Sequence, residues 1–422
     1  AEWIIDGEPS IDVWAMDVAR FGDYASPQYG TIKSSENYER RFIMTFPNET
    51  LPKGRKQKTT ALYDRFVNQG AVMGDSFGLE NVLWFANNKE DAHEEPTIKR
   101  SRSHDYVSKE VINVRENVGL IEVANFSKHE FKGPDARKFL DHIMAGRLPK
   151  PGRISLSPML SYRGKLCGDL TVACLDENEF MVFGSGAAQE MHRRWFESHL
   201  DKFNLSYSNR SDEYHGLSIA GPNSRKVLEK IVRDDVSNEK FKFRDSRRMF
   251  VGGVPAIINR ISFTGELGYE IYVAPHYQLK LYEELMEAGK EFNIKPFGGR
   301  ALMSMRLEKN WGAWTLDYRP DFTAKETGLD AFINWDKEFI GKESAQKENS
   351  SNKLVPLIVE TNEIDVTNNE AVLNGDQSIG YVTSGGFAHF VNKSVAFTFV
   401  DQKNIKSENK IQVEINGDLF NC

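Results

Sequence analysis

The sequence predicts a mixed α and β fold with two related α/β units and a small all-β module, like a β-barrel or jelly roll, at the C-terminal end. From about residue 106, short apolar strand patterns alternate with helical patterns in two successive rounds. Very polar stretches at 87–103 and 346–353 separate these rounds from the flanking sequence, and short strand patterns fill residues 354–400. We therefore divide the chain into residues 1–105, 106–345 and 346–422.

The first part carries weaker patterns. An apolar run at 3–9 ends in a Gly/Pro turn, residues 12–21 predict one or two short amphipathic turns, and a helix is predicted near 59–67. The run Lys-Gly-Arg-Lys-Gln-Lys at 53–58 is interpreted as a solvated loop rather than a nucleic-acid patch. The sequence starts without Met and without a signal-peptide pattern, which suggests the middle of a longer protein.

The two α/β rounds follow in order. The first predicts a helix at 107–114, strands at 119–123 and 126–131, a helix at 135–145, and a strand pair at 169–173 and 179–183. The second predicts a strand at 216–220, a helix at 223–232, strands at 257–262 and 269–273, and a helix at 277–288.

Composition excludes several classes of function. A net charge of −7 argues against general binding of nucleic acid or anionic membranes. No segment approaches the roughly 20 apolar residues that span a bilayer. Three scattered cysteines without a CxxC pattern indicate a reducing compartment and argue against a disulfide or zinc scaffold.

Six motifs in order give a resemblance to a known family. They are Gly-Leu-Ile-Glu-Val at 119–123 with Phe-Lys-Gly-Pro-Asp-Ala at 131–136, Ala-Gly-Pro at 220–222, Phe-Thr-Gly-Glu-Leu-Gly-Tyr-Glu at 263–270, Arg-Leu-Glu-Lys at 306–309, Phe-Ile-Gly-Lys-Glu at 339–343, and Thr-Ser-Gly-Gly at 383–386. Together they resemble the aminomethyltransferase family, the T protein of the glycine cleavage system. The resemblance implies the T-protein fold and a site for tetrahydrofolate.

The flanking sequence is similar to dimethylglycine and sarcosine dehydrogenases, in which a flavin domain precedes a T-protein-like folate domain. Residues 3–9 and 74–85 carry this similarity. It implies that residues 1–105 are the tail of a flavoprotein-type domain and a connecting segment. FAD is then expected only on an absent N-terminal half or a partner chain, because Gly-Ser-Gly-Ala-Ala-Gln at 184–189 lacks the third glycine of a dinucleotide turn.

The resemblance makes Glu270 the anchor of the pterin. A carboxylate pairs well with the N3–H and 2-amino donors of that ring. Phe263 would supply a ring wall where the family usually has Tyr. A surface carboxylate on a strand is the simpler alternative for Glu270.

Asp169 resembles the second Asp of the family's "DDL" segment, the catalytic residue, and Gly168 replaces the first. A partly desolvated carboxylate there could orient or deprotonate the folate nitrogen and stabilise an iminium cation. From the residues alone, a turn aspartate that caps its own backbone is the simpler interpretation.

The remaining candidates also follow from the resemblance. Arg300 matches an arginine that meets the folate, and Trp314 an aromatic residue that lines the cavity. Lining positions of the first unit fall on Phe126, Leu156, Phe183 and Ser185, for which core packing is an equal alternative. His129, His142, His192 and His199 lack partners at ligand spacing, so no metal site is predicted.

These observations lead to one main hypothesis. The chain would be the tetrahydrofolate-dependent one-carbon acceptor of a dimethylglycine or sarcosine dehydrogenase-like enzyme, with reduced folate and a flavin-bearing domain or subunit as partners, and would form 5,10-methylenetetrahydrofolate. Alternatives are a stand-alone folate-dependent aminomethyltransferase, methyltransferase or demethylase, and a non-catalytic folate-binding regulator. A bacterial cytoplasm is favoured, or the mitochondrial matrix for a eukaryotic source.

Overall fold

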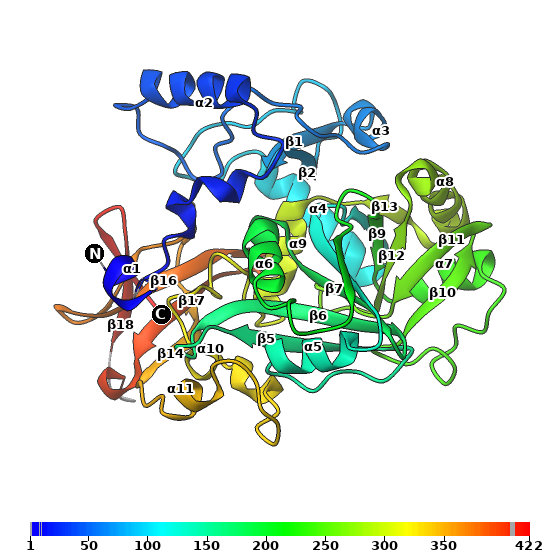
Figure 1. The fold of residues 1–422 in the computed structure, drawn as a ribbon. Coiled ribbons are helices and arrows are strands. Elements are labelled where there is room, and N and C mark those ends of the chain that lie inside the picture. The colour runs from blue at the N-terminus through cyan, green and yellow to red at the C-terminus, as the bar shows by residue number, and fades with distance from the viewer. Residues whose placement is uncertain (1, 8, 10, 406–409) are drawn as a thin grey trace.

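The computed structural model describes residues 2–7, 9, 11–405 and 410–422. The described residues form a two-stranded sheet, a five-stranded sheet and two six-stranded sheets (Figure 1). The predicted strands and helices of both α/β rounds are confirmed, with one shift. The strand predicted at 257–262 spans Val254–Asn259, and residues 260–262 belong to the following loop.

The N-terminal part is built from short elements that lie across one edge of the molecule (Figure 1). They are α1 (Glu2–Asp6), η1 (Trp14–Met16), η2 (Val18–Phe21), α2 (Pro27–Glu39), α3 (Tyr63–Asn68), β1 (Ala71–Ser76) and β2 (Leu79–Phe85). Ser26 caps α2 by accepting a hydrogen bond from the Tyr29 N–H, and Pro27 supplies a preset φ at its first position. Phe77 and Gly78 both have positive φ, which closes the β1–β2 hairpin tightly.

The first α/β unit is an antiparallel sheet in the order β5-β6-β7-β4-β8, with helices on its outer face. Its elements are β4 (Phe126–Lys132), α5 (Ala136–Ile143), β5 (Arg153–Leu160), β6 (Leu166–Asp176), β7 (Glu179–Ser185), η3 (Gly186–Ala188), α6 (Gln189–Glu197) and β8 (Ser206–Asn209). Leu170, Val172 and Val182 of the sheet pack against Phe139 of α5 and Phe196 of α6. Alternate residues therefore face the helices, and the others face away from them.

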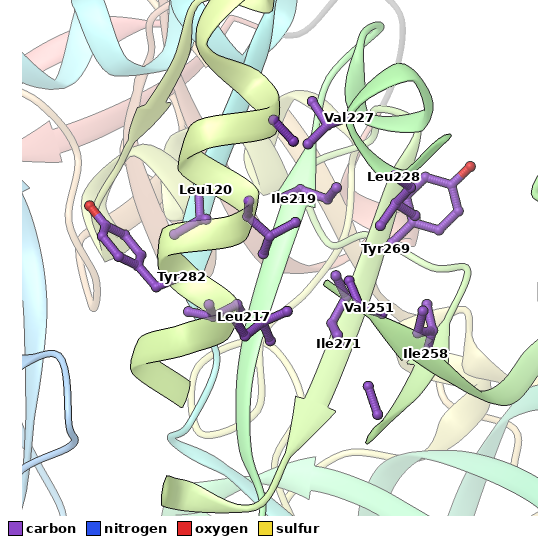
Figure 2. Packing of buried hydrophobic residues seen from close by; sticks show 14 of the residues in the cluster. Leu120, Leu217, Ile219, Val227, Leu228, Val251, Ile258, Tyr269, Ile271 and Tyr282 are labelled. Atoms are coloured by element: carbon purple, nitrogen blue, oxygen red, sulfur yellow. The ribbon is translucent and has the colours of Figure 1, made fainter. Parts of the chain in front are cut away.

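The second unit is a six-stranded sheet in the order β10-β11-β12-β9-β3-β13. Its elements are α4 (Ser103–Glu116), β3 (Val118–Glu122), β9 (His215–Ala220), α7 (Ser224–Ile231), β10 (Ser246–Val251), β11 (Val254–Asn259), β12 (Gly268–Val273), η4 (Pro275–Tyr277), α8 (Gln278–Gly289), η5 (Lys290–Phe292), β13 (Ile294–Pro296) and α9 (Gly299–Glu308). Figure 2 shows Leu217, Ile219 and Ile271 of the sheet packed with Leu228 of α7 and Tyr282 of α8. The helices cover this outer face.

The C-terminal module follows a long connection. The connection contains α10 (Ala324–Thr327), η6 (Leu329–Phe332) and α11 (Lys342–Gln346). The module contains β14 (Asn352–Val359), β15 (Ala371–Asn374), β16 (Gln377–Ala388), β17 (Lys393–Asp401), η7 (Gln402–Asn404), β18 (Ile411–Ile415) and β19 (Asp418–Asn421). Its six strands are antiparallel in the order β14-β17-β16-β15-β18-β19.

A fully buried ion pair ties the module to the connection after α9. Arg306 donates to Asp317 at 2.7 Å, and the exposed fractions of the two side chains are 1% and 0%. The same carboxylate accepts hydrogen bonds from the Ala313 N–H and from the hydroxyls of Thr383 and Ser384. Breaking this pair would leave a buried charge without compensation.

Among the described helices, none is long and apolar enough to cross a membrane.

Candidate functional site

Five of the predicted site residues share one face of the five-stranded sheet. Asp169 is paired with Pro158, two positions along from Leu156, and Thr171 is paired with both Leu156 and Phe183. Ser185, two residues after Phe183, is paired with Phe126. Residues that pair across antiparallel strands point to the same face. Phe126, Leu156, Asp169, Phe183 and Ser185 therefore all lie on the inner face, opposite α5 and α6.

Glu270 lies on the inner face of the other sheet. It pairs with Asn259 on one side and Ser218 on the other, and Tyr272 follows on the same face. The Tyr272 hydroxyl donates to Glu270 Oε2 at 2.9 Å. In the described part of the chain no other hydrogen bond reaches the Glu270 carboxylate, so Oε1 keeps its accepting capacity.

The two inner faces pack against each other. One hydrophobic cluster joins Ile257 and Tyr272 of the six-stranded sheet to Ala173, Met181 and Phe183 of the five-stranded sheet. The Phe183 and Tyr272 rings stack with centroids 4.6 Å apart. Sheets packed in this way lie about 10 Å apart. Asp169 and Glu270 thus face the same layer between the sheets. Glu270 is one same-face position from Tyr272, and Asp169 is one same-face position from Thr171, the cross-strand partner of Phe183.

Asp169 is a carboxylate without a partner from another residue. Among residues 2–7, 9, 11–405 and 410–422, only its own backbone N–H donates a hydrogen bond to it. The side chain remains partly exposed, yet burial raises its pKa to about 7. A poorly solvated carboxyl that titrates near neutral pH is suited to proton transfer.

Burial also raises the pKa of Glu270 to about 7. The hydrogen bond from Tyr272 opposes this shift, as do the charges of Lys309 and Lys128. Since the residue is nine-tenths buried, a ligand that donates to the carboxylate would meet little competition from water.

Neither lysine forms an ion pair with Glu270, because backbone carbonyls hold both ammonium groups. Lys128 Nζ donates to the carbonyls of Ala124 and Phe126 at 2.8 and 2.7 Å. Lys309 Nζ donates to the Ser262 carbonyl at 2.9 Å. The sequence analysis missed Lys128 and Tyr272. Lys128 lies in β4 and Tyr272 in β12, and nothing in the sequence of either strand indicates that both residues act on Glu270.

The connection after α9 approaches both carboxylates. Lys309 is the first residue of this connection, and its charge acts on Glu270. Tyr318 lies further along the connection, and its pKa is raised by burial and by the charge of Asp169. Trp314 is buried in a cluster that includes Tyr318 and, partly buried, Leu156. Phe263 lies half-buried in the loop between β11 and β12. The structure thus brings Trp314 close to the lining residues of the first sheet.

Arg300 is held elsewhere. Its guanidinium, in the first turn of α9, donates to Ser103 Oγ at 2.7 Å and pairs with Glu94 at 2.9 Å. It lines a cavity of about 920 Å³ between residues 45–50, the β1–β2 hairpin, α9 and the C-terminal module. Neither Asp169 nor Glu270 lines that cavity. The direction of the Arg300 side chain depends on Glu94 and Ser103 of the polar 87–103 segment, whose path the sequence did not predict.

Behind Asp169, His192 of α6 packs on the outer face of β6. Its Nε2 donates to the Cys167 carbonyl at 3.0 Å, and burial lowers its pKa to about 4. A Cβ at Gly168 would lie 3.0 Å from this nitrogen. A larger residue at this position would therefore press on His192 and on Leu170, whose Cγ would lie 3.2 Å from the added Cβ. The described residues contain no group of three or more His, Cys, Asp or Glu side chains placed to hold a metal.

Family models match most of the chain. The GCVT N-terminal domain matches residues 62–337, the glycine cleavage T-protein C-terminal barrel domain matches 352–422, and the FAD dependent oxidoreductase central domain matches 6–60.

Relatives and a solved structure agree with this. Mitochondrial dimethylglycine dehydrogenase of Mus musculus is 33% identical in an alignment that covers the whole chain and 49% of that relative's length. Mitochondrial sarcosine dehydrogenase of Mus musculus is 28% identical over 95% of the chain and 48% of its own length. The chain thus spans about half the length of these relatives. The fold matches the glycine cleavage system aminomethyltransferase T of Bartonella henselae with a TM-score of 0.74 and 22% identity, over 86% of the chain and 95% of that structure. Since the GCVT domain alone matches well over half of its residues, the chain belongs to the glycine cleavage T-protein family.

Proposed function

We propose that the layer between the two sheets binds a reduced folate, with Glu270 holding the pterin. The proposal rests on one observation above all: Asp169 and Glu270 come from different sheets, face the same layer, and each keep a carboxylate oxygen that the protein does not use. The free Glu270 Oε1 suits the donor edge of a pterin, as a charge-assisted contact. The Phe183–Tyr272 stack offers a flat aromatic wall beside it.

Asp169 would act on the reacting nitrogen. Bound tetrahydrofolate supplies the nucleophilic amine that takes up the one-carbon unit as 5,10-methylenetetrahydrofolate. A carboxylate with a pKa of about 7 can accept a proton from that amine and can stabilise the cationic carbon donor. Enclosure between sheets would also keep water from the reactive carbon.

The carbon donor would come from a flavin-bearing domain or subunit that oxidises an N-methyl amine such as dimethylglycine or sarcosine. Residues 6–60 match the central domain of FAD dependent oxidoreductases. The N-terminal part of the chain exposes large apolar side chains, including Ile4, Ile5, Met16, Val18, Phe42 and Met44, and we propose that some of them contact the flavin-bearing domain or subunit. The 920 Å³ cavity borders residues 45–50 of the same region. We propose the mitochondrial matrix as the compartment if the source is eukaryotic.

Calorimetric titration with tetrahydrofolate, without oxygen, tests the binding step. We expect one site, weakened by Glu270→Gln. Asp169→Asn should bind folate normally but form methylenetetrahydrofolate from formaldehyde about 10²- to 10⁴-fold more slowly. Equal initial rates for wild type and Asp169→Asn, after subtraction of the uncatalysed reaction, would refute the catalytic role and favour a non-catalytic folate binder. Absence of a stable flavin-bearing partner in purified complexes would instead favour a stand-alone aminomethyltransferase.

A further inference from the structure

The loop between β11 and β12 carries Phe263 and leads directly into the strand of Glu270. Its backbone is clamped on both sides of Phe263. Lys309 donates to the carbonyl of Ser262, and Arg115 Nη1 donates to the carbonyl of Thr264 at 3.0 Å. The same Nη1 reaches Glu266 Oε1 at 2.8 Å. Both cations come from outside the loop: Arg115 lies in α4, and Lys309 directly follows α9.

Arg115 is itself fixed by a second, more deeply buried carboxylate. Its Nε and Nη2 both donate to Glu308 Oε2, and the exposed fractions of the two side chains are 10% and 5%. A planar guanidinium bound in this way has little rotational freedom. Glu308 is the last residue of α9, directly before Lys309. Both cations that hold the loop are therefore fixed at the C-terminal end of α9.

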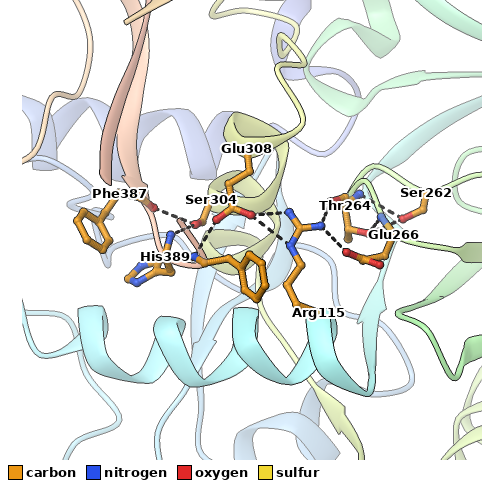
Figure 3. A network of polar contacts seen from close by, with 9 residues as sticks. Arg115, Ser262, Thr264, Glu266, Ser304, Glu308, Phe387 and His389 are labelled. Atoms are coloured by element: carbon orange, nitrogen blue, oxygen red, sulfur yellow. Dashed lines mark hydrogen bonds and ion pairs between the residues drawn. The ribbon is translucent and has the colours of Figure 1, made fainter. Parts of the chain in front are cut away.

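The network continues into the C-terminal module (Figure 3). The other oxygen of Glu308 accepts from the Phe390 N–H at 2.9 Å. One turn earlier on α9, Ser304 Oγ donates to the Phe387 carbonyl at 2.8 Å and accepts from the His389 N–H at 3.1 Å. Figure 3 shows Arg115 between the loop on one side and α9 with the β16–β17 turn on the other.

From this arrangement we infer that Arg115 and Glu308 form a positioning pair, which sets the loop of Phe263 and the start of the Glu270 strand against α9 and the C-terminal module. The inference rests on the proposed folate site. It assigns the module a part in ligand binding although no strand of the module carries a predicted site residue. Arg115 is a positioning residue here, because its donors are used by Thr264, Glu266 and Glu308.

Tetrahydrofolate titration of Arg115→Ala tests the inference. We expect the Kd to rise about tenfold or more, since a displacement near 1 Å in a binding group has effects of this size. In the free protein, amides of Thr264 and Glu266, which are bonded within the loop, should exchange hydrogen faster. Arg115→Lys should recover part of the affinity, because Lys keeps one donor and the charge. Glu266→Gln should have a smaller effect, because Glu266 is more exposed and Thr264 stays bound.

Arg137→Ala is the matched control. It also removes a guanidinium that donates to a backbone carbonyl, that of Pro149, but on α5 at the far side of the other sheet. It should leave Kd and loop exchange unchanged even if it lowers the melting temperature. If Arg115→Ala lowers the melting temperature as the control does but leaves Kd and loop exchange at wild-type values, the positioning role is wrong. If wild type binds no tetrahydrofolate, the proposed function fails instead.

Discussion

The pH dependence of folate binding gives a direct test of Glu270. Its pKa is raised to about 7 in the free protein. Only the ionised carboxylate accepts from both pterin donors, so the ligand selects that form. The affinity should therefore rise with pH through 7, and binding below pH 7 should release a proton from the protein.

The magnitude follows from the ionised fraction. With a pKa near 7, Glu270 is about 90% ionised at pH 8 and about 10% ionised at pH 6, so Kd should be roughly tenfold larger at pH 6. Glu270→Gln removes the titration and the charged acceptor. Loss of a charge-assisted hydrogen bond costs about 1.5–3 kcal/mol, which corresponds to about a 10- to 100-fold larger Kd at pH 8.

Isothermal titration calorimetry at both pH values, in two buffers of different ionisation enthalpy, measures Kd and proton release together. Asp169→Asn is the control, because Asp169 also titrates near pH 7 but is assigned to the reaction step. It should keep the slope of Kd that Glu270→Gln loses. A wild-type Kd that is flat between pH 6 and 8, or a slope that survives in Glu270→Gln, would refute the assignment of Glu270.

Three further outcomes follow from contacts described above. Tyr272→Phe removes the hydrogen bond that lowers the pKa of Glu270, so the inflection in Kd should move to higher pH; an unchanged inflection would contradict this. Asp317→Ala should lower the free energy of unfolding by about 3–5 kcal/mol, because it leaves a buried arginine without its partner; urea denaturation measures this, and a loss below about 1 kcal/mol would argue against it. Gly168→Ala should cost about 1–3 kcal/mol through overpacking on His192, and His192→Ala in the same background should recover part of the loss; no recovery would mean that another contact is responsible.

Many strands and helices of the two α/β units followed from the sequence because their apolar residues recur with the period of a helix or form short strand-like runs, whereas α6, β8, β10 and β13 were not predicted. Residues 135–145 and 223–232 show the helical spacing, and α5 and α7 occupy them. The strand Arg153–Leu160 was not predicted, since serines and a proline interrupt its apolar pattern. Helix α2 was also missed: its charged and polar residues leave only Tyr29 and Glu36 buried.

The site was less accessible to sequence reasoning than the fold. Motifs pointed to Asp169 and Glu270, but which faces of their two strands are turned toward each other depends on the register within a five-stranded and a six-stranded sheet. Arg300 was placed by motif position alone. Its rotamer is determined by Glu94 and Ser103, which belong to a segment with no periodic pattern.

The charges around Glu270 explain how the layer between the sheets can hold a carboxylate that keeps one oxygen free to accept a hydrogen bond. A lysine in direct contact would keep the group ionised, but it would occupy the oxygens that a ligand needs. Here the ammonium groups of Lys128 and Lys309 donate hydrogen bonds to backbone carbonyls instead. Their charges still act on Glu270 through a poorly screened interior and lower its pKa toward neutrality. The carboxylate is thus poised between its two protonation states, and under the proposed function a donor ligand, rather than a side chain, would complete its hydrogen bonds.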